Sequence, residues 1–178
     1  GQKTHPTGFR LGVIRTWAST WYAKGRKYRE LFIQDERIKN YIHTTLKDAG
    51  ISEILIERGK RVKVSIVTSK PGVIIGKGGS AIDELKLKLT REFHVQFDVD
   101  IQEVRTPDCD AVIIAESIQG QIERRMPYRR AAKMAIEKAM QAGALGIKVS
   151  VGGRLNGAEI ARSEYFKAGN IPLQTLRA

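Results

Sequence analysis

The sequence predicts an α+β protein in which a basic N-terminal arm precedes two small domains. Three observations support this: apolar residues repeat at helical spacing in some segments, alternate with polar residues in others, and are interrupted by Thr106-Pro107-Asp108. Two strand-like segments occur in succession, as do two helix-like segments, which disfavours a repeated strand-helix unit. We therefore expect an arm over 1–30, a domain over 31–105 with helices on one face of a small mixed sheet, and a second α/β domain over 106–178 with two helices and a short sheet.

The arm combines cations with aromatic rings and shows no clean period, so we expect at most one short helix in it. Cations that meet phosphates and rings that stack on unpaired bases favour RNA as a partner. We nevertheless expect Trp17 and Trp21 to be packing anchors rather than base-stacking residues, because large aromatic side chains dominate small cores.

In the first domain, a helix is expected from Asp35, a plausible N-cap, to Gly50, a plausible C-terminal stop. Two strands follow, one around Ile54 and Ile56 and one over 62–67, and they form a hairpin with one buried face. A glycine-rich stretch then leads into a helix and a strand. The helix has its apolar positions at Ile82, Leu85, Leu89 and Phe93, and the strand has them at Val95, Phe97, Val99 and Ile101.

The second domain begins after the break, with Asp110 as the predicted cap of a helix whose apolar face is Ile114, Ile118 and Ile122. A second helix is expected from Pro127 to Ala142, where four alanines permit close helix contact. A strand over 147–151 and an extended piece over 163–167 complete the pattern.

The charge of the chain indicates a polyanionic partner. The 178 residues carry 31 Lys+Arg against 19 Asp+Glu, a net charge of +12, which favours nucleic acid over a membrane surface. The net charge is +6 over 1–30, +2 over 31–69, −1 over 70–109 and +5 over 110–178. The positive field is therefore strongest at the two ends.

The same composition argues against several other classes. The single Cys109 and three scattered histidines indicate neither an internal disulfide nor a metal site. No apolar run approaches the ~20 residues of a membrane span, and the first six residues lack the apolar core of a secretory signal. We expect a cytoplasmic protein that is not an enzyme and has no cofactor, no membrane contact and no small-molecule substrate.

The glycine-rich stretch KPGVIIGKGGSAI (70–82) has the composition of a phosphate-binding loop. A nucleoside-triphosphatase loop is excluded, because only three residues separate Gly72 from Gly76 and Gly78 stands where a hydroxyl is needed. A dinucleotide-binding turn fits the spacing G-x-G-x-x-A, but it requires a parallel strand-helix-strand fold that the order of elements does not support. The remaining interpretation is a G-x-x-G loop, here Gly76, Lys77, Gly78 and Gly79.

Such a loop is typical of a KH domain, where it joins two helices and holds a nucleic-acid backbone. Glycines remove the Cβ atoms that would keep the backbone away, and Lys77 adds a mobile cation. We expect Val73, Ile74 and Ile75 to line the apolar side of the binding groove. A helix and a hairpin before the loop and one strand after it correspond to the type II KH arrangement. A turn of this kind without a ligand remains the alternative.

Along its whole length the chain resembles the bacterial-type small ribosomal subunit protein number three family. The resemblance rests on the order and spacing of several blocks, which are GQKTHPTGFRLG (1–12), WYA (21–23), KPGVIIGKGG (70–79), QIERR (121–125), YRRA (128–131), GRLNGAEIAR (153–162) and IPLQTLRA (171–178). Family members typically continue past the last block with strands that complete the second sheet, so either the sequence is trimmed here or those strands are absent.

The resemblance implies a structural protein of the head of the small ribosomal subunit that binds rRNA and lines the site where mRNA enters. By the matching motif, Arg129, Arg130 and Lys133 would help to unwind mRNA there, and a solvated or rRNA-packed basic helix face is the alternative. It further implies contact with the neighbouring head proteins number ten and fourteen. We also expect rRNA contacts from a wider set of cations, which are Lys3, Arg10, Arg15, Lys24, Arg26, Lys27, Arg154 and Arg162. The alternative function is a free-standing KH-domain RNA-binding or regulatory protein.

Overall fold

The computed structural model describes residues 2–177, without the side chain of Lys77, and divides into two compact units. The central unit comprises Arg15–Arg105. The terminal unit comprises the residues up to Ile14 together with those from Thr106 onward. The residues of the expected arm are thus shared between the two units.

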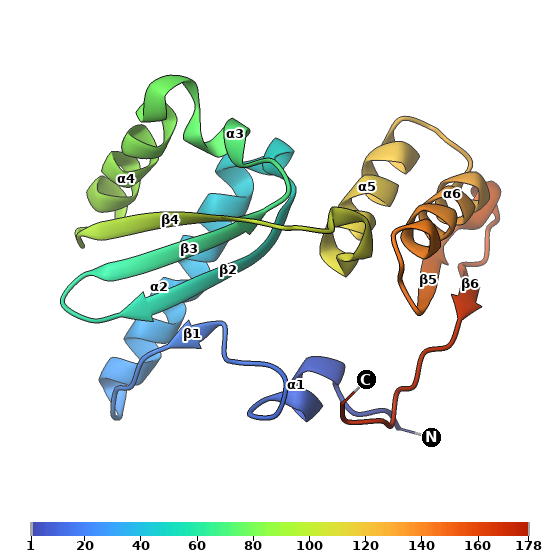
Figure 1. The fold of residues 1–178 in the computed structure, drawn as a ribbon, viewed down its shortest axis with the longest axis horizontal. Helices are drawn as coiled ribbons and strands as arrows, with labels where there is room; N and C mark the ends of the chain where they lie inside the picture. The colour runs from blue at the N-terminus through green and yellow to red at the C-terminus, as the bar shows by residue number, and fades with distance from the viewer. Residues whose placement is uncertain (1, 178) are drawn as a thin grey trace. The chain divides into compact units, whose positions relative to one another are not determined.

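The central unit is built on a mixed four-stranded sheet in the order β1-β2-β3-β4, shown in Figure 1. β1 is parallel to β2, β2 and β3 form an antiparallel hairpin, and β4 is parallel to β3. The elements are β1 (Ser19–Thr20), α2 (Arg26–Thr45), β2 (Ile51–Arg58), β3 (Val62–Thr68), α3 (Pro71–Ile75), α4 (Ser80–Phe93) and β4 (Phe97–Glu103), with short 3-10 turns at Lys47–Ala49 and Lys77–Gly79.

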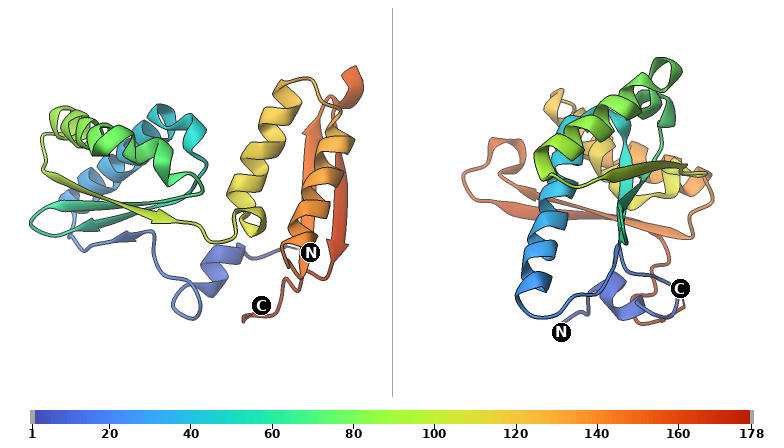
Figure 2. Two further views of the ribbon diagram at one scale, coloured as in Figure 1. Left: turned by 45° about the horizontal axis from the view of Figure 1, so that its top comes forward. Right: turned by 90° about the vertical axis from the view of Figure 1, so that its left-hand side faces the viewer.

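One face of this sheet carries the hydrophobic core, and the helices lie on that side, as Figure 2 shows. Ile56 and Val64 pair across β2 and β3 and are both fully buried. Ile42 of α2 and Leu89 of α4 pack into the same cluster. The alternation predicted for the β2–β3 hairpin is confirmed, because period-two spacing sends every second side chain to the helix side.

The prediction that the first long helix begins at Asp35 is wrong, and so is the limit of one short helix in the arm. α2 begins at Arg26, nine residues earlier, and Asp35 lies inside it on the same face as Ile38 and Ile42. Asp35 is only 2% exposed. An ionised carboxylate is rarely buried, and for this reason the sequence pattern favours a helix cap at Asp35. In the folded chain, Asp35 can be buried because it has the partners described below.

The terminal unit places two helices against a two-stranded antiparallel sheet, β5–β6. Its small core joins Ile118 of α5, Ala131 and Ala135 of α6, and Val149 of β5. Asp110 is confirmed as a helix cap, since its carboxylate accepts hydrogen bonds from the backbone N–H groups of Val112 and Ile113. The elements are α1 (Pro6–Arg10), α5 (Ala111–Glu123), α6 (Tyr128–Gln141), β5 (Gly146–Gly153) and β6 (Arg162–Gly169), with 3-10 turns at Pro107–Cys109 and Leu155–Gly157.

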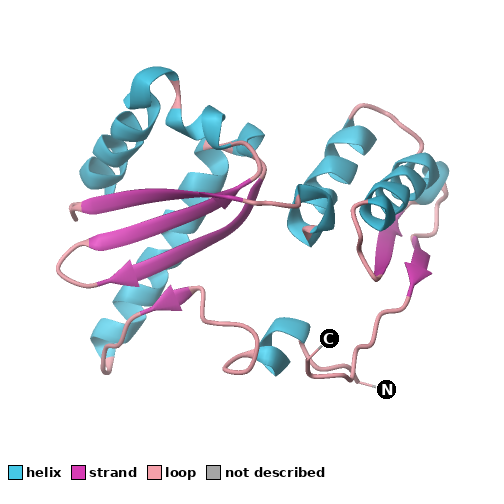
Figure 3. Ribbon diagram, viewed as in Figure 1, coloured by secondary structure: helices cyan, strands magenta, loops and turns pink. Residues whose placement is uncertain are grey.

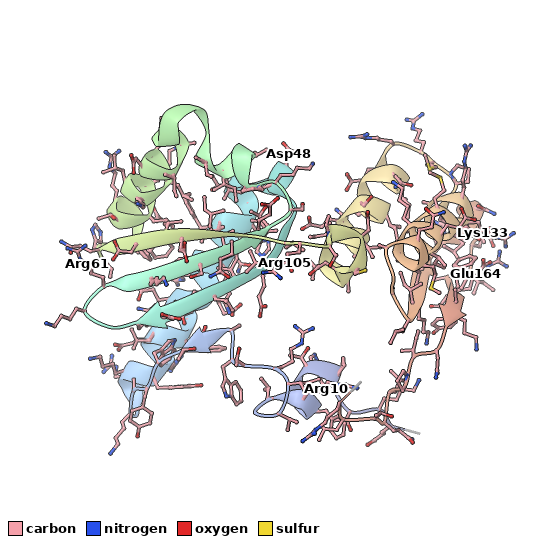
Figure 4. All side chains as sticks on the ribbon, viewed as in Figure 1. Arg10, Asp48, Arg61, Arg105, Lys133 and Glu164 are labelled. Atoms are coloured by element: carbon pink, nitrogen blue, oxygen red, sulfur yellow. The ribbon has the colours of Figure 1, made fainter. Side chains whose placement is uncertain are left out.

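Arg10 joins the two ends of the chain within the terminal unit (Figure 4). Its guanidinium donates to the carbonyl oxygen of Pro6 at 3.1 Å and to that of Thr175 at 2.8 Å. Within residues 2–177, no helix has both the length and the apolar character needed to cross a membrane.

Candidate nucleic-acid interface

The G-x-x-G turn joins α3 to α4, as predicted (Figure 3). Gly76, Gly78 and Gly79 all have positive φ, at 69°, 63° and 84°, a region that glycine enters without strain. A Cβ on Gly76 would lie 2.6 Å from the Cβ of Ala81, whereas a Cβ on Gly78 or Gly79 would meet no heavy atom within 4 Å. Gly76 is therefore required by packing, and Gly78 and Gly79 leave an open backbone that a ligand can approach.

The first turn of α4 follows this open backbone directly. The N-terminal end of a helix carries the positive end of the helix dipole, which favours phosphate. The predicted apolar lining is only partly correct. Val73 and Ile75 are 52% and 40% exposed, but Ile74 is 1% exposed and belongs to the core, because the single turn of α3 directs it inward. The side chain of Lys77 lies outside what the structure describes.

The open face of the central sheet is a poor surface for RNA. Glu57 of β2 and Asp98 of β4 lie on either side of Lys63 in register, and Lys63 also forms an ion pair with Asp100 at 3.8 Å. Arg61 pairs with Asp98 at 3.7 Å. Each cation on this face therefore has a carboxylate beside it. A phosphate backbone would meet repulsion there, so the G-x-x-G turn and the exposed cations Arg15, Lys24, Arg26 and Lys27 are the better candidates for RNA contact in this unit.

Trp21 proves to be the packing anchor among the arm aromatics. Its indole N–H donates to a carboxylate oxygen of Asp35 at 2.6 Å, and the guanidinium of Arg58 lies 6.0 Å from its ring. Trp17 is 66% exposed and Tyr22 is 81% exposed. The expectation that both tryptophans are anchors therefore holds for Trp21 and is wrong for Trp17.

The predicted rRNA-binding cations fall in both units. Arg15, Lys24, Arg26 and Lys27 are exposed in the central unit, and Arg26 pairs with Glu30 at 3.2 Å. The terminal unit holds the other four. Lys3 is exposed and Arg10 is half-buried in the contacts above. Arg154 donates to the carbonyl oxygen of Ala158 at 2.9 Å, and Arg162 lies 3.6 Å from Glu164.

The three cations predicted to contact mRNA all lie on α6 but differ in their surroundings. Arg129 forms a forked contact with Glu164 of β6, with N–O distances of 3.0 and 3.2 Å, and also donates to the hydroxyl of Tyr128. These hydrogen bonds raise the pKa of Arg129, and those from Arg129 lower the pKa of the Glu164 carboxyl. Part of the Arg129 charge is therefore neutralised before any ligand binds.

Arg130 and Lys133 are exposed, and among the described residues no carboxylate lies within 4 Å of either. Figure 4 labels Lys133 and Glu164 on neighbouring parts of the terminal unit. Lys133 also lines a shallow groove with Tyr165 and Lys167 of β6. Sequence reasoning did not identify Tyr165, Lys167 or Lys148 as candidates. Their alternation with apolar strand residues is visible in the sequence, but the strand register that brings them together is not.

Among residues 2–177, no group of three or more histidine, cysteine, aspartate or glutamate side chains is placed to hold a metal ion. The surfaces described above present exposed cations, exposed aromatic rings and open backbone, which are the groups that proteins use to bind nucleic acid.

Family models match two parts of the chain. Residues 37–108 match the family model "KH domain", and residues 118–178 match "Ribosomal protein S3, C-terminal domain".

The chain is 49% identical to small ribosomal subunit protein uS3 of Carboxydothermus hydrogenoformans, across the whole chain and 81% of the relative. It is 51% identical to uS3 of Dictyoglomus turgidum, across the whole chain and 74% of the relative. The chain also matches uS3 of Albidiferax ferrireducens at 49% identity but spans only 60% of that protein's length. On the identity and coverage of these alignments, the chain belongs to the small ribosomal subunit protein uS3 family.

Proposed function

We propose that this chain is a structural component of the head of the small ribosomal subunit that binds rRNA and catalyses no reaction. The observation that carries the proposal is the family match, which extends over the whole chain. The net charge of +12 supports it, because a protein embedded in rRNA must neutralise phosphates.

The proposal extends to the partners. The central unit would hold rRNA through the G-x-x-G turn and the cations Arg15, Lys24, Arg26 and Lys27, and 31–105 would be the type II KH domain. In the terminal unit, Arg130 and Lys133, together with Arg129, would contact mRNA where it enters the subunit. Head proteins number ten and fourteen would be protein neighbours, and the ribosome-bound protein would be cytoplasmic.

Sedimentation tests the main proposal. A tagged copy of the chain, expressed in bacterial cells, should sediment with small subunits and remain there at moderate salt, because many contacts hold it. A free-standing KH-domain regulator, the alternative function, would instead appear in fractions that contain free RNA or soluble protein. Recovery only in those lighter fractions would refute a ribosomal role.

The contribution of the G-x-x-G turn can be measured separately. Changing Lys77→Asp and Gly78→Asp together should weaken a local RNA contact and leave subunit association largely intact, since most of the positive charge lies outside residues 70–109. Position 78 has open space and φ of 63°, a conformation that aspartate and asparagine adopt with less strain than most other residues. The measurement is chemical footprinting of rRNA in purified subunits.

The matched control is Lys77→Asn with Gly78→Asn. It places a side chain at the same positive φ of position 78 but introduces no negative charge. We expect it to keep most of the footprint. If the aspartate variant lost all subunit association, the turn would be the main RNA contact. The expectation that residues outside 70–109 supply most of the binding would then be wrong.

A further inference from the structure

The open face of the β5–β6 hairpin carries cations that the fold leaves uncompensated. Lys148 of β5 and Lys167 of β6 are directly opposite each other in the antiparallel register, and both are exposed. Like charges at directly opposed positions destabilise a sheet. Such a pair is expected only where another benefit outweighs the repulsion.

Among the described residues, no acidic side chain on this face relieves that repulsion. Ser150, Ser163 and Tyr165 are the other exposed side chains of the two strands there, and none is acidic. Glu164 points to the opposite face, where it binds Arg129 of α6. The central sheet differs, since its exposed cations Lys63 and Arg61 each have an aspartate partner.

An aromatic ring that is open to solvent lies beside Lys148 on this face. The ammonium of Lys148 lies 4.6 Å from the ring centre of Tyr165, and Tyr165 is 62% exposed. The two residues are diagonal neighbours, because Ser150 is the residue opposite Tyr165. A cation beside an exposed ring can bind a phosphate and stack on an adjoining base.

This face continues toward the cations of α6. The groove between α6 and β6 is lined by two cations, Lys133 and Lys167, by one carboxylate, Glu137, and by Tyr165. A strand of RNA lying along Lys133 would therefore reach Lys167, Tyr165 and then Lys148 without leaving the terminal unit.

We propose that Lys148, Tyr165 and Lys167 form a binding surface for single-stranded RNA, in which phosphates neutralise the opposed lysines and a base stacks on the tyrosine. The inference rests on the RNA-binding function proposed above and adds a surface to it. Single-stranded RNA is the favoured occupant because its unpaired bases can stack on the exposed ring of Tyr165. The bases of a duplex are already stacked on one another and are not available to the ring.

Binding of the full chain to a fluorescent twelve-nucleotide oligouridylate, measured by anisotropy over a range of salt, tests the proposal. Lys148→Ala with Lys167→Ala should weaken binding about tenfold and reduce the salt slope by roughly 1.4, because each single-strand phosphate that a lysine neutralises adds about 0.7 to that slope. Tyr165→Ala should weaken binding by about fivefold or more, and Tyr165→Phe should retain it. The control, Lys47→Ala with Lys60→Ala, removes the same charge from the central unit.

A second variant separates binding from folding. Lys167→Glu places a carboxylate opposite Lys148, so hydrogen exchange of the β5 and β6 amides should slow while RNA binding weakens. A change that strengthens the hairpin and harms binding cannot be explained by misfolding. Unaltered exchange would overturn the premise that the lysines repel each other.

Equal losses in the Lys47/Lys60 control would mean that only net charge matters, and would overturn the proposal. Full binding by the Lys148/Lys167 and Tyr165 variants would also overturn it, while sedimentation of the wild-type chain with small subunits would leave the proposed function standing. Normal RNA binding combined with poor incorporation of the variants into subunits would identify a protein neighbour on this face instead, against the proposal.

Discussion

Asp35→Ala is expected to lower the free energy of unfolding of the central unit by about 3–5 kcal/mol, the usual cost of leaving one member of a buried ion pair without its partner. Arg58 donates to one carboxylate oxygen of Asp35 through Nε at 2.8 Å and through Nη2 at 2.5 Å, and Trp21 donates to the other at 2.6 Å. The side chains of Asp35 and Arg58 are only 3% and 9% exposed. Without the carboxylate, a guanidinium would be buried with no counter-charge.

Urea unfolding followed by tryptophan fluorescence measures this loss selectively, because both tryptophans of the chain lie in the central unit. Glu36→Ala is the matched control one position along α2. It removes an exposed pair with Lys39 and should cost less than about 1 kcal/mol. Replacing Asp35 and Arg58 together by Leu and Met should cost less than Asp35→Ala alone, since no charge then remains buried. A loss below about 1 kcal/mol for Asp35→Ala would show that the network contributes little.

Replacing Arg129, Arg130 and Lys133 together by Ala is expected to slow translation of messages with stable secondary structure and to spare unstructured ones. Exposed cations in a row can hold single strands by their phosphates as a duplex opens. If each cation contributes about 1 kcal/mol to this hold, its removal is a roughly fivefold effect. Ribosomes that carry the variant chain, translating matched messages with and without a hairpin, provide the measurement.

The structure makes the prediction specific to individual residues. Arg129→Ala should have the smallest effect of the three, because Glu164 already occupies its guanidinium. Arg130→Ala and Lys133→Ala should have larger effects, since both cations are exposed without such a pair. Lys138→Ala, a change of the same charge farther along α6, is the control. Equal slowing of structured and unstructured messages would remove the unwinding role.

Local patterns predicted much of the fold. The alternation of Val62, Val64 and Ile66 predicted a half-buried strand, and Asp110 before an apolar helix predicted a cap, because both signals depend on neighbours within a few residues. The G-x-x-G turn was predictable for the same reason. Its glycines are needed for backbone conformations that do not depend on distant residues.

Two of the sequence predictions are wrong because of tertiary packing. The start of α2 was misplaced because Asp35 behaves as a buried helix residue only when Arg58, 23 residues away, and Trp21 reach it. Ile74 was assigned to a groove because its inward direction depends on how α3 packs against the core. In both cases tertiary packing outweighed the local preference of the residue type.

By itself, the sequence determined the kind of partner, the family and the G-x-x-G turn, since net charge, block order and glycine conformation are properties of the chain alone. Only the tertiary structure decided which cations are available to a ligand. Arg129 is partly neutralised by Glu164, 35 residues away, while Lys148 and Lys167 are brought face to face by strand register. Electrostatic interaction depends on distance in space, and folding, not the order of residues, sets that distance.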